Sequence, residues 1–411
     1  MSLPYGWFKS REAVRVPYDV RRRPAVLLIL LGAVTAVGPL SIDMYLPAFP
    51  AISDDLGATP ARVQLSLTAC LIGVALGQLV GGPLSDRWGR RRPVLVGTVC
   101  YVLVALACAV APTAEALVGL RLLQGIAGGV GVVVARAVVR DLFSGVDAVR
   151  FFSRLLIIFG VAPIAAPALG ALVLSVTSWR GIFVVLAVIA ALLAVVLARW
   201  LPETLPAERR NPDGLAGTAR AARTALTDRT FVGYALTQGF AFAGLFAYLA
   251  GSPYVLQDGF GLSPAMFSLV FGVNSVGLIA IGQLNARLVG RHRTRSLFVG
   301  ALVAGVLAAA ALVVGAASGQ LWLVLVPLAV YVGSIGMVLP NGTALALENH
   351  GRHAGTAAAL LGAVGSGIGA LAAPLVGLAG TTSALPMALI ILGAAGSSLT
   401  VVLTLARGRT S

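Results

Sequence analysis

Charge is scarce in this 411-residue sequence: only 11% of the residues are Asp, Glu, Lys or Arg, whereas 58% are hydrophobic. Acidic residues are the scarcer sign, with 15 against 30 basic residues, of which one is Lys. Soluble domains carry about 25% charged residues. The composition therefore excludes a soluble protein and indicates a polytopic membrane protein. A net charge of +15 suggests nucleic acid only in a soluble chain, so no nucleic-acid partner is expected here.

Cysteine and histidine are also rare, with three residues of each. The cysteines lie in apolar runs without metal-ligand spacing, and the histidines lie in short polar stretches. This pattern predicts no disulfide framework, no metal site and no cofactor. No intramembrane His, Glu or Lys stands near a nucleophile, so the sequence does not predict an enzyme. Residues 1–24 are polar and basic and lack the apolar core of a cleaved signal peptide.

Apolar runs of about 20 residues, long enough to cross a bilayer, occur in two sets of six. They lie near 25–50, 63–83, 94–111, 115–138, 153–175, 181–201, 230–255, 265–288, 296–317, 320–341, 355–379 and 384–405. The sequence therefore predicts an all-α protein with twelve transmembrane helices in two bundles. The predicted segments are a basic N-terminus (1–24), an N-terminal bundle (25–201), a central loop (202–228), a C-terminal bundle (229–405) and a tail (406–411).

The arginines predict the orientation. With the N-terminus inside, the segments on the cytoplasmic side hold 26 Lys and Arg residues, and the outer segments hold two, Arg62 and Arg180. Because positive residues remain inside, both termini are expected in the cytoplasm, in a bacterial inner membrane.

The two halves repeat. GPLSDRWGRRR at 82–92 and GQLNARLVGRH at 282–292 match at four positions with an offset of 200 residues. Two similar six-helix halves around a central site are typical of an alternating-access transporter.

The loop between the second and third spans, QLVGGPLSDRWGRRRPVL at 78–95, resembles a signature of the major facilitator superfamily. The matching residues are Gly82, Asp86, Arg87, Gly89, Arg90 and Arg91. The resemblance implies a latch that holds the cytoplasmic side shut. In it, Asp86 faces the positive N-terminus of helix 11, and Arg90 pairs with Asp141. Alternatively, the arginines serve only to keep the loop inside.

Two further stretches resemble motifs of the same superfamily. In RLLQGIAGGVGVVVARAVVRD (121–141), Arg121, Gln124 and Arg136 lie roughly on one face of a helix, which predicts a water-lined interior. Alternatively, Arg136 snorkels to the inner surface. GVAPIAAPALGALV (160–173) resembles the helix 5 motif of drug:proton antiporters, in which small residues and prolines allow close approach and bending. The retained residues are Pro163, Pro167 and Gly170.

Glycines at spacing four in the second span and in the eleventh predict faces for close helix contact. In this fold they are expected to line the contact between the two halves, with ordinary tight packing as the alternative. They are Gly73, Gly77 and Gly81, with Gly365 and Gly369.

GPLSIDMYLPAFPAI (38–52) and LPETLPAERR (201–210) resemble the bicyclomycin/chloramphenicol-resistance branch of these antiporters. The resemblance implies proton-coupled drug efflux, with Asp43 as the protonation site. An Asp at membrane depth costs roughly 2.5–3.5 kcal/mol, which favours a functional role. We expect Asp43 and Arg121 to exchange one proton as the cavity changes access, and Pro39 and Pro47 to loosen the helix there. Alternatively, Asp43 lies hydrated near the outer interface.

The substrate cavity is predicted to include Gln124 and Arg136 from the first half, facing a mostly apolar wall from the second. The second-half candidates are Gln238, Phe242, Tyr248, Asn274, Tyr331 and Asn341. One acid and two arginines favour neutral or weakly polar antibiotics over multivalent cations. A monomer driven by the proton motive force is expected. A proton-symport importer of a small metabolite is the alternative function, since sequence does not fix the direction of transport.

Overall fold

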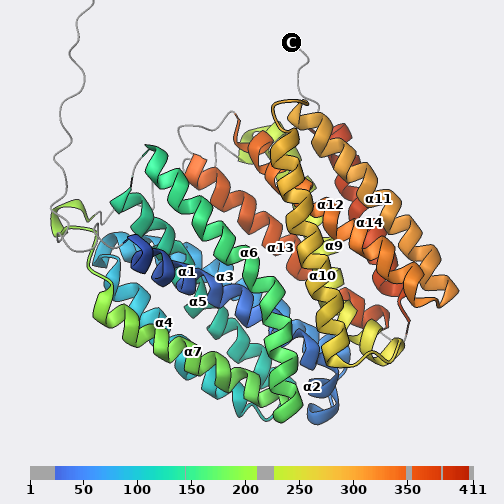
Figure 1. The fold of residues 1–411 in the computed structure, drawn as a ribbon, viewed down its shortest axis with the longest axis horizontal. Helices are drawn as coiled ribbons and strands as arrows, with labels where there is room; N and C mark the ends of the chain where they lie inside the picture. The colour runs from blue at the N-terminus through green and yellow to red at the C-terminus, as the bar shows by residue number, and fades with distance from the viewer. Residues whose placement is uncertain (1–23, 144, 211–225, 349–353, 381–382, 407–411) are drawn as a thin grey trace, which may run out of the picture.

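The computed structural model describes residues 24–143, 145–210, 226–348, 354–380 and 383–406, and these form helices joined by short loops (Figure 1). The N-terminal half contains α1 (Pro24–Asp43), η1 (Leu46–Ala48), α2 (Phe49–Leu56), α3 (Pro60–Trp88), α4 (Arg91–Ala109), α5 (Ala114–Leu142), α6 (Gly145–Val176) and α7 (Trp179–Trp200). After η2 (Ala207–Arg209), the C-terminal half contains α9 (Arg229–Tyr254), η3 (Val255–Gly259), α10 (Pro264–Leu288), α11 (Thr294–Ser318), α12 (Leu321–Leu347), α13 (Ala354–Ala379) and α14 (Leu385–Thr404). Much of the predicted central loop, 211–225, lies outside the described residues.

Eleven spans in the described part of the chain are long and apolar enough to cross a membrane. A shorter apolar helical stretch, Val161–Val176, lies in α6, where the fifth span was predicted. The prediction of a multi-pass helical membrane protein is therefore confirmed.

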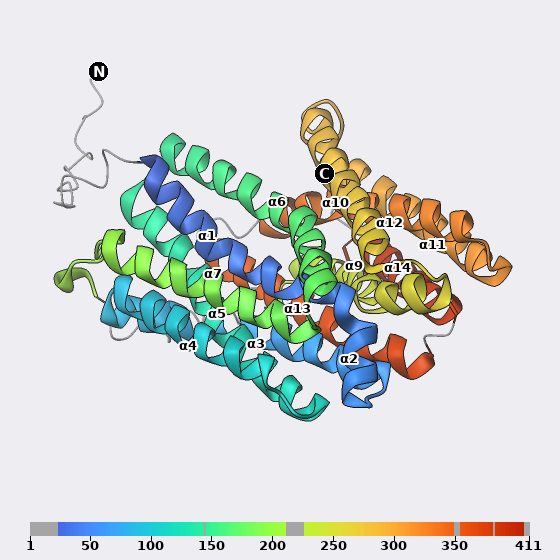
Figure 2. The same cartoon turned by 60° about the horizontal axis from the view of Figure 1, so that its bottom comes forward.

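The two halves pack their helices in the same way, as the repeat in the sequence predicts. Within the N-terminal half, α3 packs on α5, α4 on α7 and α1 on α6. The equivalent pairs of the C-terminal half are α10 with α12, α11 with α14 and α9 with α13. Between the halves, α3 packs on α13 and α6 on α10, and this pair of contacts is itself related by the repeat (Figures 1 and 2).

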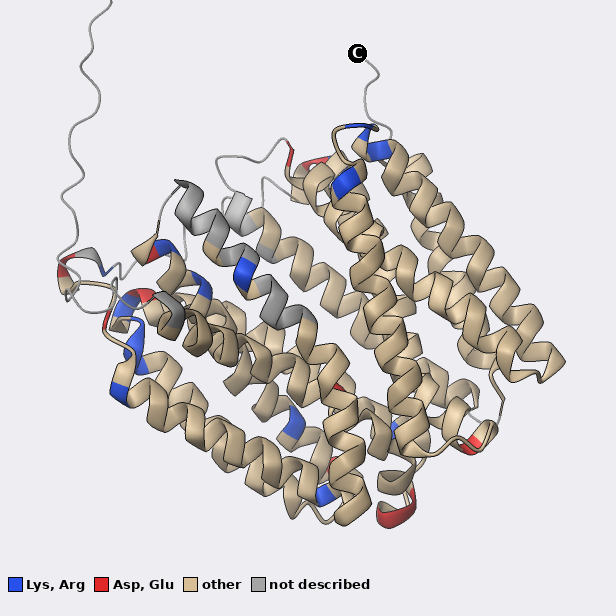
Figure 3. Cartoon of the chain, viewed as in Figure 1, with Lys and Arg blue, Asp and Glu red and all other residues tan. Residues whose placement is uncertain are grey.

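The molecule has two distinct ends. We call the end with α2, η3 and the first turns of α3 and α10 the closed end, and the opposite end, with the α3–α4 and α10–α11 loops, the charged end. Figure 3 shows most of the basic residues at the charged end and acidic residues at α2. Hydrogen bonds between the halves join residues in the parts of their helices nearer the closed end. They are Gln64 Nε2 to Ala250 O (2.9 Å), Thr68 Oγ1 to Ala370 O (2.8 Å), Ser268 Oγ to Pro167 O (2.9 Å), Gln257 Nε2 to Pro47 O (3.1 Å), Tyr254 OH to Phe49 O (3.3 Å) and the Ser53–Tyr254 hydroxyl pair (2.8 Å).

Helices α3 and α5 interlock through glycines. A Cβ added at Gly73 or Gly77 would collide with carbonyl oxygens of α5, and one added at Gly125 or Gly129 would collide with carbonyls of α3. Two backbones at this separation leave no room for any side chain between them. The expectation that Gly73 and Gly77 lie between the halves is wrong, because the helix that they approach belongs to their own half.

The glycines of α13 also face a helix of their own half. Gly365 and Gly369 are seated against the rings of Phe242 and Phe246, which belong to α9 of the same half. The two rings stack on each other with centroids 6.0 Å apart. The predicted role of these glycines between the halves is therefore also wrong, and the alternative of tight packing holds.

The interlocking predicts a strong position dependence for Gly-to-Ala changes in α5. Gly125→Ala places a methyl group against the Cys70 carbonyl, so we expect a loss of roughly 2–3 kcal/mol from overpacking. Gly119→Ala, in the same helix with nothing within 4 Å, is the control and is expected to be neutral or slightly stabilising. Thermal unfolding of the purified proteins in detergent measures both, and equal melting temperatures would contradict the interlocked packing.

Candidate functional site

The first span is not one continuous helix. It was predicted to run through 25–50, but α1 ends at Asp43 and the chain continues as η1 and α2. Pro47 and Pro50 occupy the first turns of these two short helices, where a missing N–H costs little. The break leaves the last carbonyls of α1 without partners from the helix itself. Inside a membrane each of these carbonyls needs another donor.

Arg121 of α5 supplies one of these donors. Its Nη2 donates to the carbonyl oxygen of Ser41 at 2.8 Å, which in an unbroken helix would accept from the N–H of residue 45. Its Nη1 donates to Gln124 Oε1, and the guanidinium lies 4.4 Å from the ring centroid of Tyr45. The side chain is 0% exposed. A cation at a helix C-terminus also interacts favourably with the helix dipole, so Arg121 acts as a cap for α1.

Arg121 approaches α1 at the main-chain carbonyl of Ser41, and no hydrogen bond or ion pair joins its guanidinium to Asp43 in the described residues. The exchange of a proton between Asp43 and Arg121 stays a prediction. The Gln124 side chain is fully buried and accepts from Arg121.

Asp43 lies at the break, facing the C-terminal half. It is 6% exposed, and the residues that follow it, Met44 to Leu46, are 0% exposed, so the hydrated alternative does not hold. Its carboxylate has no hydrogen bond or ion pair to any described side chain. It interacts electrostatically with Tyr248 of α9.

Tyr248 connects Asp43 to α10. Its hydroxyl accepts a hydrogen bond from Asn274 Nδ2 at 3.1 Å, and its ring stacks on Phe271 with centroids 5.6 Å apart. Because the hydroxyl oxygen is the acceptor in this bond, its own proton is free to be donated. Of the predicted cavity residues, Tyr248 is therefore within electrostatic range of Asp43, and Asn274 is bonded to Tyr248.

Gly170 of α6 packs closely against the break that follows α1. A Cβ at this position would collide with the carbonyl oxygen of Met44. The close helix approach predicted for this motif is therefore present, and it occurs at the residue next to Asp43. Pro163 and Pro167 lie within α6, and the Pro167 carbonyl accepts from Ser268 of the other half.

Two predicted cavity residues are instead buried inside the C-terminal half. Asn341 and Asn285 exchange two amide hydrogen bonds of 2.7 and 3.1 Å, which join α12 to α10. Tyr331 is 2% exposed and its hydroxyl lies against Gly244 of α9 without a partner among the described residues. The contacts of both residues thus lie within their own bundle.

Three others lie apart from Asp43 as well. Gln238 of α9 is buried and accepts from Thr343 Oγ1 at 3.4 Å, and Phe242 is half-buried against α13. Arg136 is exposed toward the charged end, beside the like charge of Arg140.

The charged end contains the predicted pair of Arg90 and Asp141. Arg90 Nε donates to Asp141 Oδ2 at 2.8 Å, and its Nη1 donates to Asp86 Oδ1 and to Ser85 Oγ. Although burial lowers the pKa of Arg90, its bonds to Asp141 and Asp86 raise that pKa above its ordinary value, so the guanidinium stays charged. Asp86 contacts Arg90 in its own half. The predicted contact with the start of helix 11 involves residues 349–353, which lie outside the described ones.

Glu203, which sequence reasoning missed as a functional residue, organises the rest of this loop. Its carboxylate accepts from the backbone N–H groups of Arg90 (2.7 Å), Arg91 (3.2 Å) and Leu205 (3.0 Å). These bonds cap the start of α4 from the exit of α7. Gly89, at φ 87°, passes against this carboxylate where no side chain fits. An acid directly after an apolar span, within LPET, is the signal that points to it.

Removing the Glu203 charge tests this cap. In Glu203→Gln the hydrogen bonds to Arg90 N and Arg91 N lose their ionic component, so we expect a loss of roughly 1–2 kcal/mol. Glu208→Gln, an exposed neighbour in η2, is the matched control and is expected to change little. The comparison is made by thermal unfolding in detergent, and a Glu208→Gln protein that is equally destabilised would refute the cap.

Known proteins share this architecture. A profile of the Major Facilitator Superfamily (MFS) matches residues 31–374. The chain is 43% identical over 368 residues to the MFS-type transporter YdgK of Bacillus subtilis, covering 89% of this chain and 91% of the relative. It is 32% identical over 363 residues to a bicyclomycin resistance protein homolog of Haemophilus influenzae, covering 88% and 91%. A crystal structure of a mutant nucleoside transporter NupG has the same fold, with a TM-score of 0.74, 13% identity and coverage of 92% and 98%. The chain therefore belongs to the Major Facilitator Superfamily of membrane transporters.

Proposed function

We propose that this protein exports amphipathic drugs in exchange for protons, by alternating access, and that Asp43 is the coupling group. The observation that carries the proposal is the position of Asp43: a buried carboxylate without an ionic partner among the described residues, at a break of a membrane-spanning helix that faces the other half. Burying an ionised carboxylate costs free energy, and protonation of the carboxylate removes that cost. Gaining or losing the proton therefore changes the local free energy by several kcal/mol.

The contacts between the halves support alternating access. The hydrogen bonds that join the described residues of the two halves lie on the closed-end side. The arginine distribution predicts that the charged end is cytoplasmic, so this is a state closed to the outside. Tyr248 couples Asp43 to α9 and α10 of the opposite half. Ionised Asp43 would accept a hydrogen bond from the Tyr248 hydroxyl and hold the halves together, and protonation of Asp43 would weaken that bond and release them.

The substrate class follows from the site and from one relative. The Asp43 surroundings contribute one carboxylate, a phenol and an amide, and Arg121 is already engaged as a helix cap. This favours a neutral or weakly polar ligand with an apolar body. The name of the Haemophilus relative, a bicyclomycin resistance protein homolog, points to the same class.

A growth-inhibition panel in a bacterial host without its own efflux pumps tests the proposal. Wild-type and Asp43→Asn proteins are expressed at matched membrane levels and challenged with chloramphenicol-like and bicyclomycin-like antibiotics and with a divalent cationic dye. We expect resistance to the neutral antibiotics, lost in Asp43→Asn, and none to the dye. Resistance to none of the compounds, together with proton-dependent uptake of a metabolite in membrane vesicles, would replace efflux by import.

A further inference from the structure

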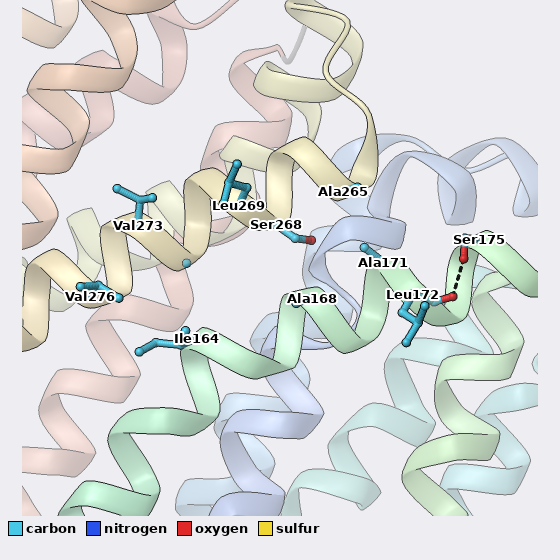
Figure 4. A pocket seen from close by; sticks show the side chains of 11 residues that line it. Ile164, Ala168, Ala171, Leu172, Ser175, Ala265, Ser268, Leu269, Val273 and Val276 are labelled. Atoms are coloured by element: carbon cyan, nitrogen blue, oxygen red, sulfur yellow. Dashed lines mark hydrogen bonds between the residues drawn. The ribbon is translucent and has the colours of Figure 1, made fainter.

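A groove of about 720 Å³ runs between α6 and α10, and Asp43 is not among its lining residues (Figure 4). Its floor consists of small residues from both halves, among them Ala168 and Ala171 of α6 and Ala265 and Gly272 of α10. Its rims are Leu172 on one side and Leu269 and Val273 on the other, each at least 60% exposed. The α10 wall belongs to a span of membrane-crossing length, and the α6 wall belongs to the shorter apolar stretch Val161–Val176 of a 32-residue helix, so the rims face the hydrocarbon of the bilayer.

The groove is the size of a small-molecule site but lacks the polar anchors of one. Ligand pockets are typically about 300–1,000 Å³ and contain a few free polar groups that orient the ligand. Only two side chains with hydroxyl groups line this groove, and both hydroxyls are engaged. Ser175 Oγ donates to Leu172 O at 2.7 Å, the dashed line in Figure 4, and Ser268 Oγ donates to the carbonyls of Pro264 and Pro167. An occupant is therefore held by apolar contact alone.

We propose that the groove binds one acyl chain of a membrane phospholipid. A flexible hydrocarbon chain needs no polar anchor and reaches the groove directly from the bilayer, whereas a drug with polar groups would leave them unpaired there. The groove is also continuous with the contact between the halves, since the Ser268–Pro167 hydrogen bond crosses from α10 to α6 at its floor. A chain that contacts both walls binds best while α6 and α10 are together, so it favours the state closed at this end. Binding of the chain does not depend on the proposed transport function, whereas its effect on the closed state rests on the alternating access proposed above.

Photocrosslinking distinguishes a bound chain from ordinary lipid contact. The photoreactive residue benzoylphenylalanine is introduced at Leu269, on the groove rim, or at Leu307 of α11, which has a similar exposure of 65% against 61% but lies outside the groove. Each protein is reconstituted in phosphatidylethanolamine and phosphatidylglycerol, transferred to detergent and irradiated as the remaining lipid is reduced stepwise. We expect the phospholipid adduct at 269 to persist at lipid levels where the adduct at 307 has fallen several-fold. If the two adducts decline together, the groove is ordinary lipid-facing surface and the proposal is wrong.

A filling substitution provides the second test. Gly272 has nothing within 4 Å of an added Cβ, so Gly272→Leu fills the groove without a backbone collision. It is expected to reduce the adduct at 269 to the level of the adduct at 307. Gly300→Leu on α11, equally open, is the control and is expected to have no effect. An unchanged adduct in Gly272→Leu would overturn the proposal, as would loss of the adduct on adding an antibiotic that the protein transports, because the occupant would then be the drug.

Discussion

An Asp43→Asn protein is expected to fold and to reach the membrane, yet to lose the ability to concentrate its substrate. One proton moving down ~150 mV supplies about 3.5 kcal/mol, enough for a gradient of a few hundred-fold. Because Asn cannot exchange a proton, this gradient should fall to about one, the value at equilibrium without coupling. Substrate distribution across inside-out vesicles with an imposed proton gradient measures the effect.

Asp55→Asn is the matched control. It removes the same charge from the same half, but Asp55 lies in α2, where it accepts from Trp179 and Arg180. The Asp55→Asn protein is expected to keep its gradient. Counterflow without a proton gradient should survive in Asp43→Asn, because exchange down a gradient needs binding but not coupling. Asp43→Asn vesicles that still concentrate substrate would eliminate Asp43 as the coupling group.

Arg121→Lys is expected to destabilise the protein by roughly 2–4 kcal/mol. The change keeps the charge, but one ammonium cannot reach the Ser41 carbonyl and Gln124 Oε1 together while lying over the Tyr45 ring. A buried acceptor that loses its donor costs roughly 1–3 kcal/mol, and the lost ring contact adds about 0.5–2 kcal/mol. Thermal unfolding in detergent measures the loss.

The same variant separates the two roles considered for Arg121. If its charge alone mattered for exchange with Asp43, Arg121→Lys would keep both coupling and stability. Capping of α1 requires the planar, forked guanidinium, so the lysine should fail. Arg136→Lys, an exposed arginine of the same helix, serves as the control and is expected to melt with the wild type.

The sequence predicts the helices of this protein well, and the pairing of their faces less well. Apolar length places most of the spans, although α1 ends at Asp43 before the predicted end and α6 begins at Gly145 before the predicted start. The pair of Arg90 and Asp141 was predictable because Arg90 lies in a recognisable loop motif and Asp141 at the end of the helix 4 motif. The glycines of α3 were predicted to face the other half, whereas they face α5. Spacing along a helix fixes which residues share a face, but not which neighbour that face meets, because rotation about the helix axis is set by packing.

The break at Asp43 shows the same limit at the site. Two prolines and an acid in SIDMYLPAFP indicate an interruption, but not which carbonyls are freed or what satisfies them. Arg121 donates to the Ser41 carbonyl, two residues before Asp43. The partners of the carbonyls around the break come from two distant segments, Arg121 from α5 and Tyr254 and Gln257 from the junction of α9 and η3, and only the folded chain brings them together.

The two partners of each hydrogen bond between the halves differ in how sensitive they are to substitution. Apart from the Ser53–Tyr254 pair, each joins a side-chain donor to a main-chain acceptor. Exchanging Ala250 for another residue that fits leaves its carbonyl in place, whereas exchanging Gln64 removes the donor. The acceptor positions of this interface, in both halves, can therefore change residue without compensating changes across it. A search for pairs of positions that vary together would find little trace of these contacts between the halves.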